Sequence, residues 1–217
     1  MAIGDIREPN EAWQQLKREV LKKEWDYVFR RLFYTATTDI SKSAFSAPIE
    51  IDSVEETAGH ITNLDLFVDA RGHAHLLYLR KPHQYAFLRD KYFPRQAMTS
   101  ELVYAIAEKN RNVRKEVLLA TSTEGDSFRE PTFARFHVGA EESLHVVCAT
   151  KTNQTTTNWL LSINPRSEPS QILLNKPFQR FFTSTPRGGT APSDAIHLFG
   201  TSDDIPNLRY ASVQIQE

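Results

Sequence analysis

The sequence has one cysteine and no excess of either charge, and each scarcity excludes a class of protein. A single cysteine cannot form an intramolecular disulfide, and the position of Cys148 in the apolar run "LHVVCATK" favours a buried structural thiol over a nucleophile. Lys and Arg number 26 against 27 for Asp and Glu, a net charge of −1, so no general attraction to nucleic acid or to an anionic membrane is expected.

The sequence also lacks long hydrophobic runs, and none approaches the length of a membrane-spanning helix. The first residues, "MAIGDIREPNEAW", are acidic where a signal peptide would be basic and then apolar. As written, the sequence therefore predicts a cytosolic protein, or an extracytoplasmic one if it is a fragment of a longer exported chain. Its 217 residues, 40% of them hydrophobic and 24% charged, are typical of a soluble globular protein.

The segment 10–25, "NEAWQQLKREVLKKEW", has the pattern of an amphipathic helix with Asn10 as its N-cap. Apolar residues recur at helical spacing, at Trp13, Leu16, Val20 and Leu21. Acidic residues interrupt the basic face, so we expect the apolar stripe to contact the rest of the chain rather than a membrane. We therefore divide the chain into an N-terminal helical segment, 1–25, and a domain of strands, 26–217.

After residue 25 the sequence is rich in aromatic and β-branched residues, and turn residues such as Gly72, Gly139, Pro165, Gly188 and Gly189 separate short segments of this kind. This composition predicts an all-β domain. The expected strands are Leu64–Val68, Ala74–Arg80, Leu102–Glu108, Arg114–Thr121, Thr132–His137, Leu144–Thr150, Asn158–Asn164, Gln171–Leu174, Arg180–Ser184, Ala195–Gly200 and Arg209–Gln214.

A repeat is visible among these strands. The segments "LFVDARGHAHLLYLRK", "ARFHVGAEESLHVVCATK" and "FTSTPRGGTAPSDAIHLFGTSDD" each contain a strand, a polar turn, and then a histidine followed by apolar residues. The aligned histidines are His75, His145 and His197. A position that recurs in three separate hairpins indicates a role in packing rather than one shared metal or catalytic site. His73, beside the turn, is expected to be solvated.

Each such hairpin is followed by one or two further strands, and four antiparallel strands form a blade of a β-propeller. The domain has room for about three to four four-stranded blades, whereas closed propellers have about four to eight. We therefore expect a partial β-propeller. Such a partial propeller would be part of a larger propeller, a truncated product, or a piece that closes by association. Its terminal sheets would expose apolar faces, so we expect the chain to self-associate. The N-terminal helix would cover one of them.

Four segments, "FYTATTDISKSAFSAPIEI", "NLDLFVDARGHAHLLYLRK", "TSTEGDSFREPTFARFHV" and "FFTSTPRGGTAPSDAIHLFG", resemble the sialidase-like propeller proteins with BNR, or Asp-box, repeats. An Asp box is a hairpin turn of the Ser-x-Asp-x-Gly-x-Thr-Trp type. The segments "TTDISKSAFSAPIEI" and "STEGDSFREPTF" lie where Asp boxes would be expected but lack the full Gly-x-Thr-Trp pattern. The resemblance thus implies the fold and carries over no residue of the sialidase catalytic set.

What the resemblance implies is a location for a ligand, at the starts of the innermost strands near the propeller axis. The residues expected there are His60, Asn63, Asp65, Arg135, His137 and Arg187. Two further arginines, Arg80 and Arg89, would line the same opening. Arg135 faces either a partner carboxylate or an axial cavity, and Arg187 is either a ligand residue or a solvated turn residue. The aromatic residues of "HQYAFLRDKYFP" would stack on sugar rings or cover the edge of a blade.

The resemblance makes carbohydrate recognition or processing the leading hypothesis for function, with a glycan as the partner. Asp65 and Glu130 are the only carboxylates that suit acid/base work in a glycosidase of the sialidase-like type, and the sequence places them in no pair. The alternatives are a non-catalytic binding or scaffold module and a remnant of a larger exported enzyme. No phosphate-binding loop, zinc spacing or nucleophile elbow is present, so no metal or cofactor is expected.

Overall fold

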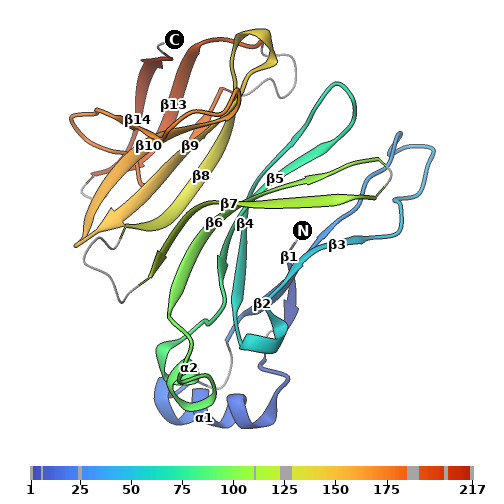
Figure 1. Cartoon of the computed structure of the whole chain (residues 1–217), viewed down its shortest axis with the longest axis vertical. Coiled ribbons are helices and arrows are strands. Elements are labelled where there is room, and N and C mark those ends of the chain that lie inside the picture. Colours follow the sequence, from blue (N-terminus) through green and yellow to red (C-terminus); the bar gives the residue numbers. More distant parts are fainter. Residues whose placement is uncertain are drawn as a thin grey trace.

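The chain is built mostly of β-strands, with two α-helices at one end (Figure 1). The computed structural model describes residues 2–5, 7–23, 26–109, 111–122, 129–184, 191–202 and 205–215. Each strand expected from the sequence overlaps an observed strand, so the all-β prediction is confirmed.

The strands form four antiparallel sheets that follow one another along the chain. Sheet 1 contains β1 (Ala2–Asp5), β2 (Val28–Tyr34) and β3 (Ile49–Ser53), and sheet 2 contains β4 (His60–Val68), β5 (Ala74–Lys81), β6 (Thr99–Ala107) and β7 (Val113–Ser122). Sheet 3 contains β8 (Glu130–Val138), β9 (Leu144–Thr152), β10 (Thr155–Asn164) and β11 (Ser170–Ile172), and sheet 4 contains β12 (Arg180–Thr183), β13 (Ala195–Ser202) and β14 (Ile205–Gln214). Short 3₁₀ turns lie at Glu55–Thr57 and Ala140–Glu142.

Within each sheet, strands that are consecutive in the sequence are hydrogen-bonded neighbours. The expected four strands per unit are found in sheets 2 and 3, whereas sheets 1 and 4 have three strands each in the described residues. Strand β2 contacts β4, β4 contacts β8, and β8 contacts β12. Sheets 2, 3 and 4 therefore meet through their first strands, β4, β8 and β12, whereas sheet 1 contacts β4 chiefly through its central strand β2, and none of the four sheets closes on itself.

The N-terminal helix is shorter than expected and is not the first element. Helix α1 (Glu11–Leu21) starts after Asn10, whose side chain accepts from the backbone N–H of Trp13, and ends where Lys22 adopts the left-handed conformation. Trp25 lies outside the described residues. Strand β1 precedes α1 and pairs with β2, so the segment expected to be helical also contributes residues 2–5 to sheet 1.

The buried face of α1 also differs from the expected apolar stripe. Val20 is exposed, whereas Lys17 is buried and forms ion pairs with Glu8 at 3.1 Å and with Asp26 at 3.3 Å. The carboxylate of Glu8 in turn accepts two hydrogen bonds from Arg30 on β2. The helix is thus held to sheet 1 by a buried ionic cluster.

The aromatic segment "HQYAFLRDKYFP", for which no helix was expected, contains a second helix, α2 (Ala86–Tyr92), which lies beside α1 in Figure 1. The Trp13 ring of α1 lies 6.2 Å from the ring of Tyr92 and 6.1 Å from that of Phe93, measured between centroids. Tyr85 donates to the carboxylate of Asp26, and its ring stacks on that of Phe87. These aromatic residues therefore contact α1, Asp26 and one another, an arrangement that neither of the two expectations described.

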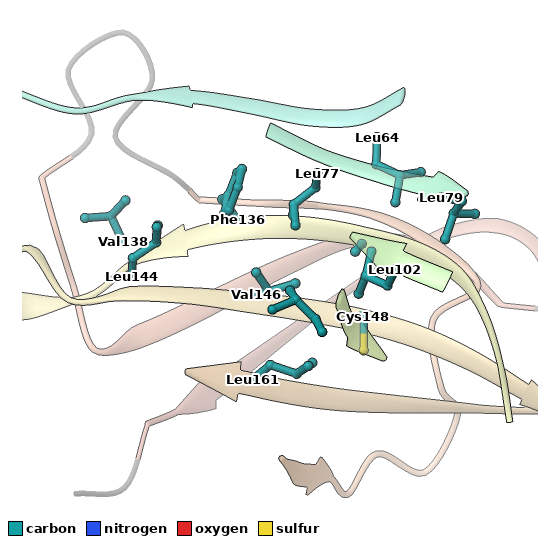
Figure 2. Packing of buried hydrophobic residues seen from close by; sticks show 12 residues of the cluster. Leu64, Leu77, Leu79, Leu102, Phe136, Val138, Leu144, Val146, Cys148 and Leu161 are labelled. Carbon is teal, nitrogen blue, oxygen red and sulfur yellow. The ribbon is translucent and has the colours of Figure 1, made fainter. Parts of the chain in front are cut away.

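Three apolar clusters fill the spaces between successive sheets. The largest lies between sheets 2 and 3 and includes Leu77, Leu102, Phe136 and Val146 (Figure 2). Cys148 belongs to this cluster, as expected for a structural thiol, and its complete burial raises its pKa. Sheets 2 and 3 are buried on both faces, which explains why β5 and β9 read as continuous apolar runs rather than alternating ones.

Candidate functional site

The histidines aligned in the sequence occupy equivalent places in the structure. His75, His145 and His197 lie near the starts of β5, β9 and β13, the second strands of sheets 2, 3 and 4. In each case the Nδ1 atom is hydrogen-bonded to a hydroxyl of the third strand: Tyr104 at 2.7 Å, Ser162 at 3.0 Å and Tyr210 at 2.7 Å. The repeat read from the sequence is therefore confirmed, and its histidines link neighbouring strands.

One of these histidines, His75, also lines a large cleft in the described structure. This cleft has a volume of about 970 Å³ and lies between one end of sheet 2 and one end of sheet 3. Its walls come from the β4–β5 turn, strands β6 and β7, the β8–β9 turn and the end of β10. Four of the side chains that line it carry the chemistry discussed next: Asp69, His73, His75 and Tyr104.

The four side chains form a connected polar group. The backbone N–H of His73 donates to Asp69 Oδ1 at 2.8 Å, which fixes the carboxylate within the turn. The other oxygen, Oδ2, lies 3.4 Å from His73 Nδ1 and 3.4 Å from His75 Nε2. The approach to His75 lacks hydrogen-bond geometry, so Nε2 has no hydrogen-bond partner. On the other side of the ring, Nδ1 lies 2.7 Å from the Tyr104 hydroxyl, and the tautomer of His75 decides which of the two donates.

Burial sets the ionisation of this group. It lowers the pKa of His75 and raises the pKa of Tyr104 to about 12, so both rings are neutral at pH 7. Burial opposes ionisation of Asp69, but the hydrogen bond from the His73 backbone and the neighbouring imidazoles outweigh it and lower the pKa. The cleft is thus lined by one fixed carboxylate, Asp69, and by the neutral rings of His75 and Tyr104. An un-ionised phenol of this kind is a hydrogen-bonding group and a poor nucleophile.

The rim of the cleft carries charged side chains. Glu108 and Arg114 pair with each other at 3.0 Å. Glu141 and Glu142 lie on the β8–β9 turn with φ values of 54° and 59°, the left-handed region that costs non-glycine residues energy. Within the part of the chain that the structure describes, neither glutamate has an ion-pair partner. The strained turn therefore presents two uncompensated carboxylates to the opening.

Those residues predicted at the propeller axis that the structure describes lie outside this cleft. Asp65 and Arg135 come together, with 3.2 Å between Oδ1 and Nη1, and with Asn63 they line a smaller pocket of about 350 Å³. An irregularity in the pairing of β4 next to Asn63 aims the Asp65 carboxylate at β8, where it also accepts from the Phe136 backbone. The pair therefore joins sheets 2 and 3, and Arg135 faces a partner carboxylate, one of its two expected environments. Arg187 lies outside the described residues.

The other predicted arginines are also held by protein partners. Arg80 pairs with Glu101 at 2.6 Å and with Asp52 of sheet 1 at 3.3 Å, and Lys115 pairs with the same Asp52 at 2.7 Å. Arg89 donates to the carboxylate of Asp90 and to a backbone carbonyl within the α2 region. The structure thus brings neither Arg80 nor Arg89 to the pocket beside Asp65.

The two predicted histidines are part of the interior. His137 is fully buried and donates from Nε2 to the Ser193 carbonyl at 2.6 Å, which leaves Nδ1 without a partner. His60 packs edge-on against Phe29. Burial lowers the pKa of both imidazoles. Neither residue lines a cavity described above.

The two carboxylates considered for acid/base work do not form a pair. Glu130 is bound by Lys81 at 2.6 Å, at the start of β8. Asp65 contacts β8 at Phe136, six residues further along, which corresponds to roughly 20 Å of strand. Glycosidase carboxylates work at about 5–10 Å from each other. The sequence did not point to the cleft group, although the turn "VDARGHAH" contains three of its four residues.

No described helix is long and apolar enough to cross a membrane. In the described ranges, no three His, Cys, Asp or Glu side chains are grouped so that they could hold a metal ion. A scan against protein-family models, a search of curated proteins and a search of solved structures each found no match. The resemblance to sialidase-like proteins therefore remains a hypothesis from the sequence.

Proposed function

We propose that this protein is a sialidase-like propeller protein that recognises carbohydrate, and that the cleft between sheets 2 and 3 is its binding site. The single observation that carries the proposal is the cleft itself, with Asp69, His73, His75 and Tyr104 among its lining residues. Its volume of about 970 Å³ is that of a cavity for a small ligand or a short glycan.

The propeller part of the proposal is supported by the order of the sheets. Consecutive antiparallel sheets, each made of neighbouring strands, are the construction of propeller blades. The contacts of β4 with β8 and of β8 with β12 would be those of the innermost strands of successive blades, whereas sheet 1 contacts β4 chiefly through its central strand β2. In this arrangement the pocket beside Asp65 and Arg135 lies next to the axis, and the large cleft opens between two blades.

The side chains favour a neutral glycan over an acidic one. Aromatic and imidazole rings offer faces to the C–H groups of sugars, and carboxylates accept hydrogen bonds from hydroxyls. Glu141 and Glu142 at the rim would repel a ligand that carries its own carboxylate. The ligand class we propose is therefore a neutral oligosaccharide.

Recognition without hydrolysis fits the chemistry better than catalysis does. Asp65 and Glu130 are too far apart along β8 to act on one glycosidic bond. The Tyr104 hydroxyl is held in its neutral form, with a pKa of about 12, which does not favour its use as a nucleophile. We therefore favour a non-catalytic binding module over a glycosidase.

The test is a glycan array that contains neutral and sialylated oligosaccharides, followed by calorimetric titration of the best neutral ligand. Glu142→Gln and Tyr104→Phe should each weaken binding, because each removes one polar group and keeps the shape of the side chain. Glu168→Gln, an exposed position outside the cleft, is the matched control and should bind as the unmodified protein does. Selective binding of sialylated glycans, or turnover of fluorogenic glycosides, would contradict the proposal.

A further inference from the structure

Sheet 4 exposes an apolar face on which the Arg135 guanidinium, 5.0 Å from the ring of Phe182, covers one side chain in part. The strand register places Phe182, Phe199 and Tyr210 side by side across β12, β13 and β14, and Leu208 follows on the same face of β14. These four side chains are between 46% and 63% exposed. We call this surface the outer face of sheet 4. The opposite face, with Phe181, Ile196 and Leu198, is buried against sheet 3.

The outer face of sheet 4 is built like the face of sheet 2 that meets sheet 3. In sheet 4 the rings of His197 and Tyr210 stack with centroids 5.9 Å apart and planes 17° apart. In sheet 2 the rings of His75 and Tyr104 stack at 5.9 Å and 20°. The imidazole Nδ1 lies 2.7 Å from the tyrosine hydroxyl in both pairs. The same arrangement thus occurs once inside the molecule and once on its surface.

The internal copy shows what such a face normally meets. Phe136 of β8 in sheet 3 lies edge-on against both rings, with centroids 6.4 Å from His75 and 6.2 Å from Tyr104. Among the described residues, no side chain makes this contact with His197 and Tyr210. Among the described residues, the outer face of sheet 4 thus has the paired rings of its counterpart in sheet 2 but not the neighbouring sheet that packs on them.

We propose that a second copy of the chain covers this face, with the outer face of sheet 4 against the same face of its partner across a two-fold axis. Such an interface must match itself, and two-fold dimers are the commonest protein assemblies. Strand alternation places one formal charge, Arg180, on the described part of this face. Two copies therefore meet with little repulsion between like charges.

The competing arrangement, sheet 4 of one copy on sheet 1 of the other, has a specific cost. The charged side chains of Arg31 on β2 and Glu50 on β3 form an exposed ion pair on sheet 1, with 45% and 41% of the side chains accessible. Covering them with Phe199 and Tyr210 would remove both charges from water without offering a polar partner. The geometry therefore favours contact between like faces.

The size of the face sets the expected strength of the dimer. Four large side chains, each about half exposed, give on the order of 400 Å² of apolar surface per copy. A typical stable interface buries about 800 Å² per partner, so we expect a weak dimer whose population depends on protein concentration.

Sedimentation velocity on the full chain, over concentrations from micromolar to near millimolar, tests the proposal. We expect a reversible shift from monomer to dimer. Phe199→Glu should raise the dissociation constant at least about tenfold, because it places two carboxylates at the centre of the interface. Ile40→Glu, on the exposed β2–β3 connection, is the matched control and should leave the constant unchanged. Circular dichroism verifies that both variants are folded.

A second measurement does not depend on the folding of a charged variant. Phe199→Cys should form a disulfide-linked dimer on mild oxidation, faster than Ile40→Cys does, because Phe199 lies in the middle of the aromatic row. Cys148 is buried and does not compete. The proposal is overturned by a monomer at every concentration, by a dimer insensitive to Phe199→Glu, or by equal cross-linking at positions 199 and 40.

Discussion

Replacement of Asp65 by alanine should destabilise the protein far more than replacement of its partner Arg135. The Asp65 side chain is 2% exposed and accepts hydrogen bonds from the backbone N–H groups of Leu66 and Phe136, both at 2.9 Å, besides the guanidinium of Arg135. Removal of the carboxylate leaves the Arg135 cation, whose side chain is only 17% exposed, without its ion-pair partner. The backbone N–H groups of Leu66 and Phe136 lose the same acceptor.

The magnitudes follow from what each change leaves behind. Removing one member of a buried ion pair costs about 3–5 kcal/mol, and we expect Asp65→Ala to fall in that range. Arg135→Met breaks the same pair and the hydrogen bond to the Leu64 carbonyl, but it keeps much of the volume and leaves the carboxylate its two backbone donors, so we expect about 1–3 kcal/mol. For a chain of this size, the alanine variant should melt roughly 10 °C or more below the unmodified protein.

The assay is urea unfolding followed by circular dichroism, with thermal melts as a second measure. If Arg135→Met were the more damaging change, or if Asp65→Ala left the free energy of unfolding unchanged, the assignment of this pair as a joint between sheets 2 and 3 would be refuted. A ligand-binding role for Arg135, as expected from the sequence, gives a different outcome. Its replacement would then lower glycan affinity without changing stability.

Three further predictions concern the interior. Lys17→Ala should cost about 3 kcal/mol because it removes a buried cation from Glu8, whereas Val20→Ala on the exposed side of α1 should cost less than about 0.5 kcal/mol; urea titrations compare them. Burial lowers the pKa of His137 from 6.5, so the protein should lose stability as the pH falls below about 6.5, where the unfolded chain binds more protons, and His137→Gln should reduce that loss in melts at several pH values. Gly200→Ala should be strongly destabilising, since a Cβ there would lie 2.0 Å from the Arg180 carbonyl oxygen, and thermal melts measure it.

The strands and the histidine repeat could be read from the sequence because both depend on local pattern. Apolar residues follow one another in β5 and β9, and each hairpin places its histidine directly after a polar turn. Helix α2 was missed because its start lacks the usual signal: Tyr85 precedes it and makes no capping hydrogen bond through its side chain. The sequence pattern of the aromatic residues around it fits several structures equally well.

The buried charges and the cleft depend on contacts between distant segments, which one sequence does not show. Lys17 looks like a surface residue of α1 until Glu8 and Asp26 are placed beside it. The cleft combines the β4–β5 turn with the β8–β9 turn, about 70 residues later, and neither turn is unusual alone. Asp65 and Arg135 were both identified as important, but their distance from each other, which decides their role, required the fold.

The ionic joints between sheets have a consequence for the order in which the sheets assemble. Apolar clusters lie between each pair of successive sheets, so apolar contact alone does not specify which sheets are neighbours. Asp52 of sheet 1 meets Arg80 and Lys115 of sheet 2, whereas Asp65 of sheet 2 meets Arg135 of sheet 3. A misordered stack would bury these charges without their partners, at a cost of several kcal/mol for each joint. The buried ion pairs therefore favour the observed order of the sheets over stacks in which similar sheets exchange places.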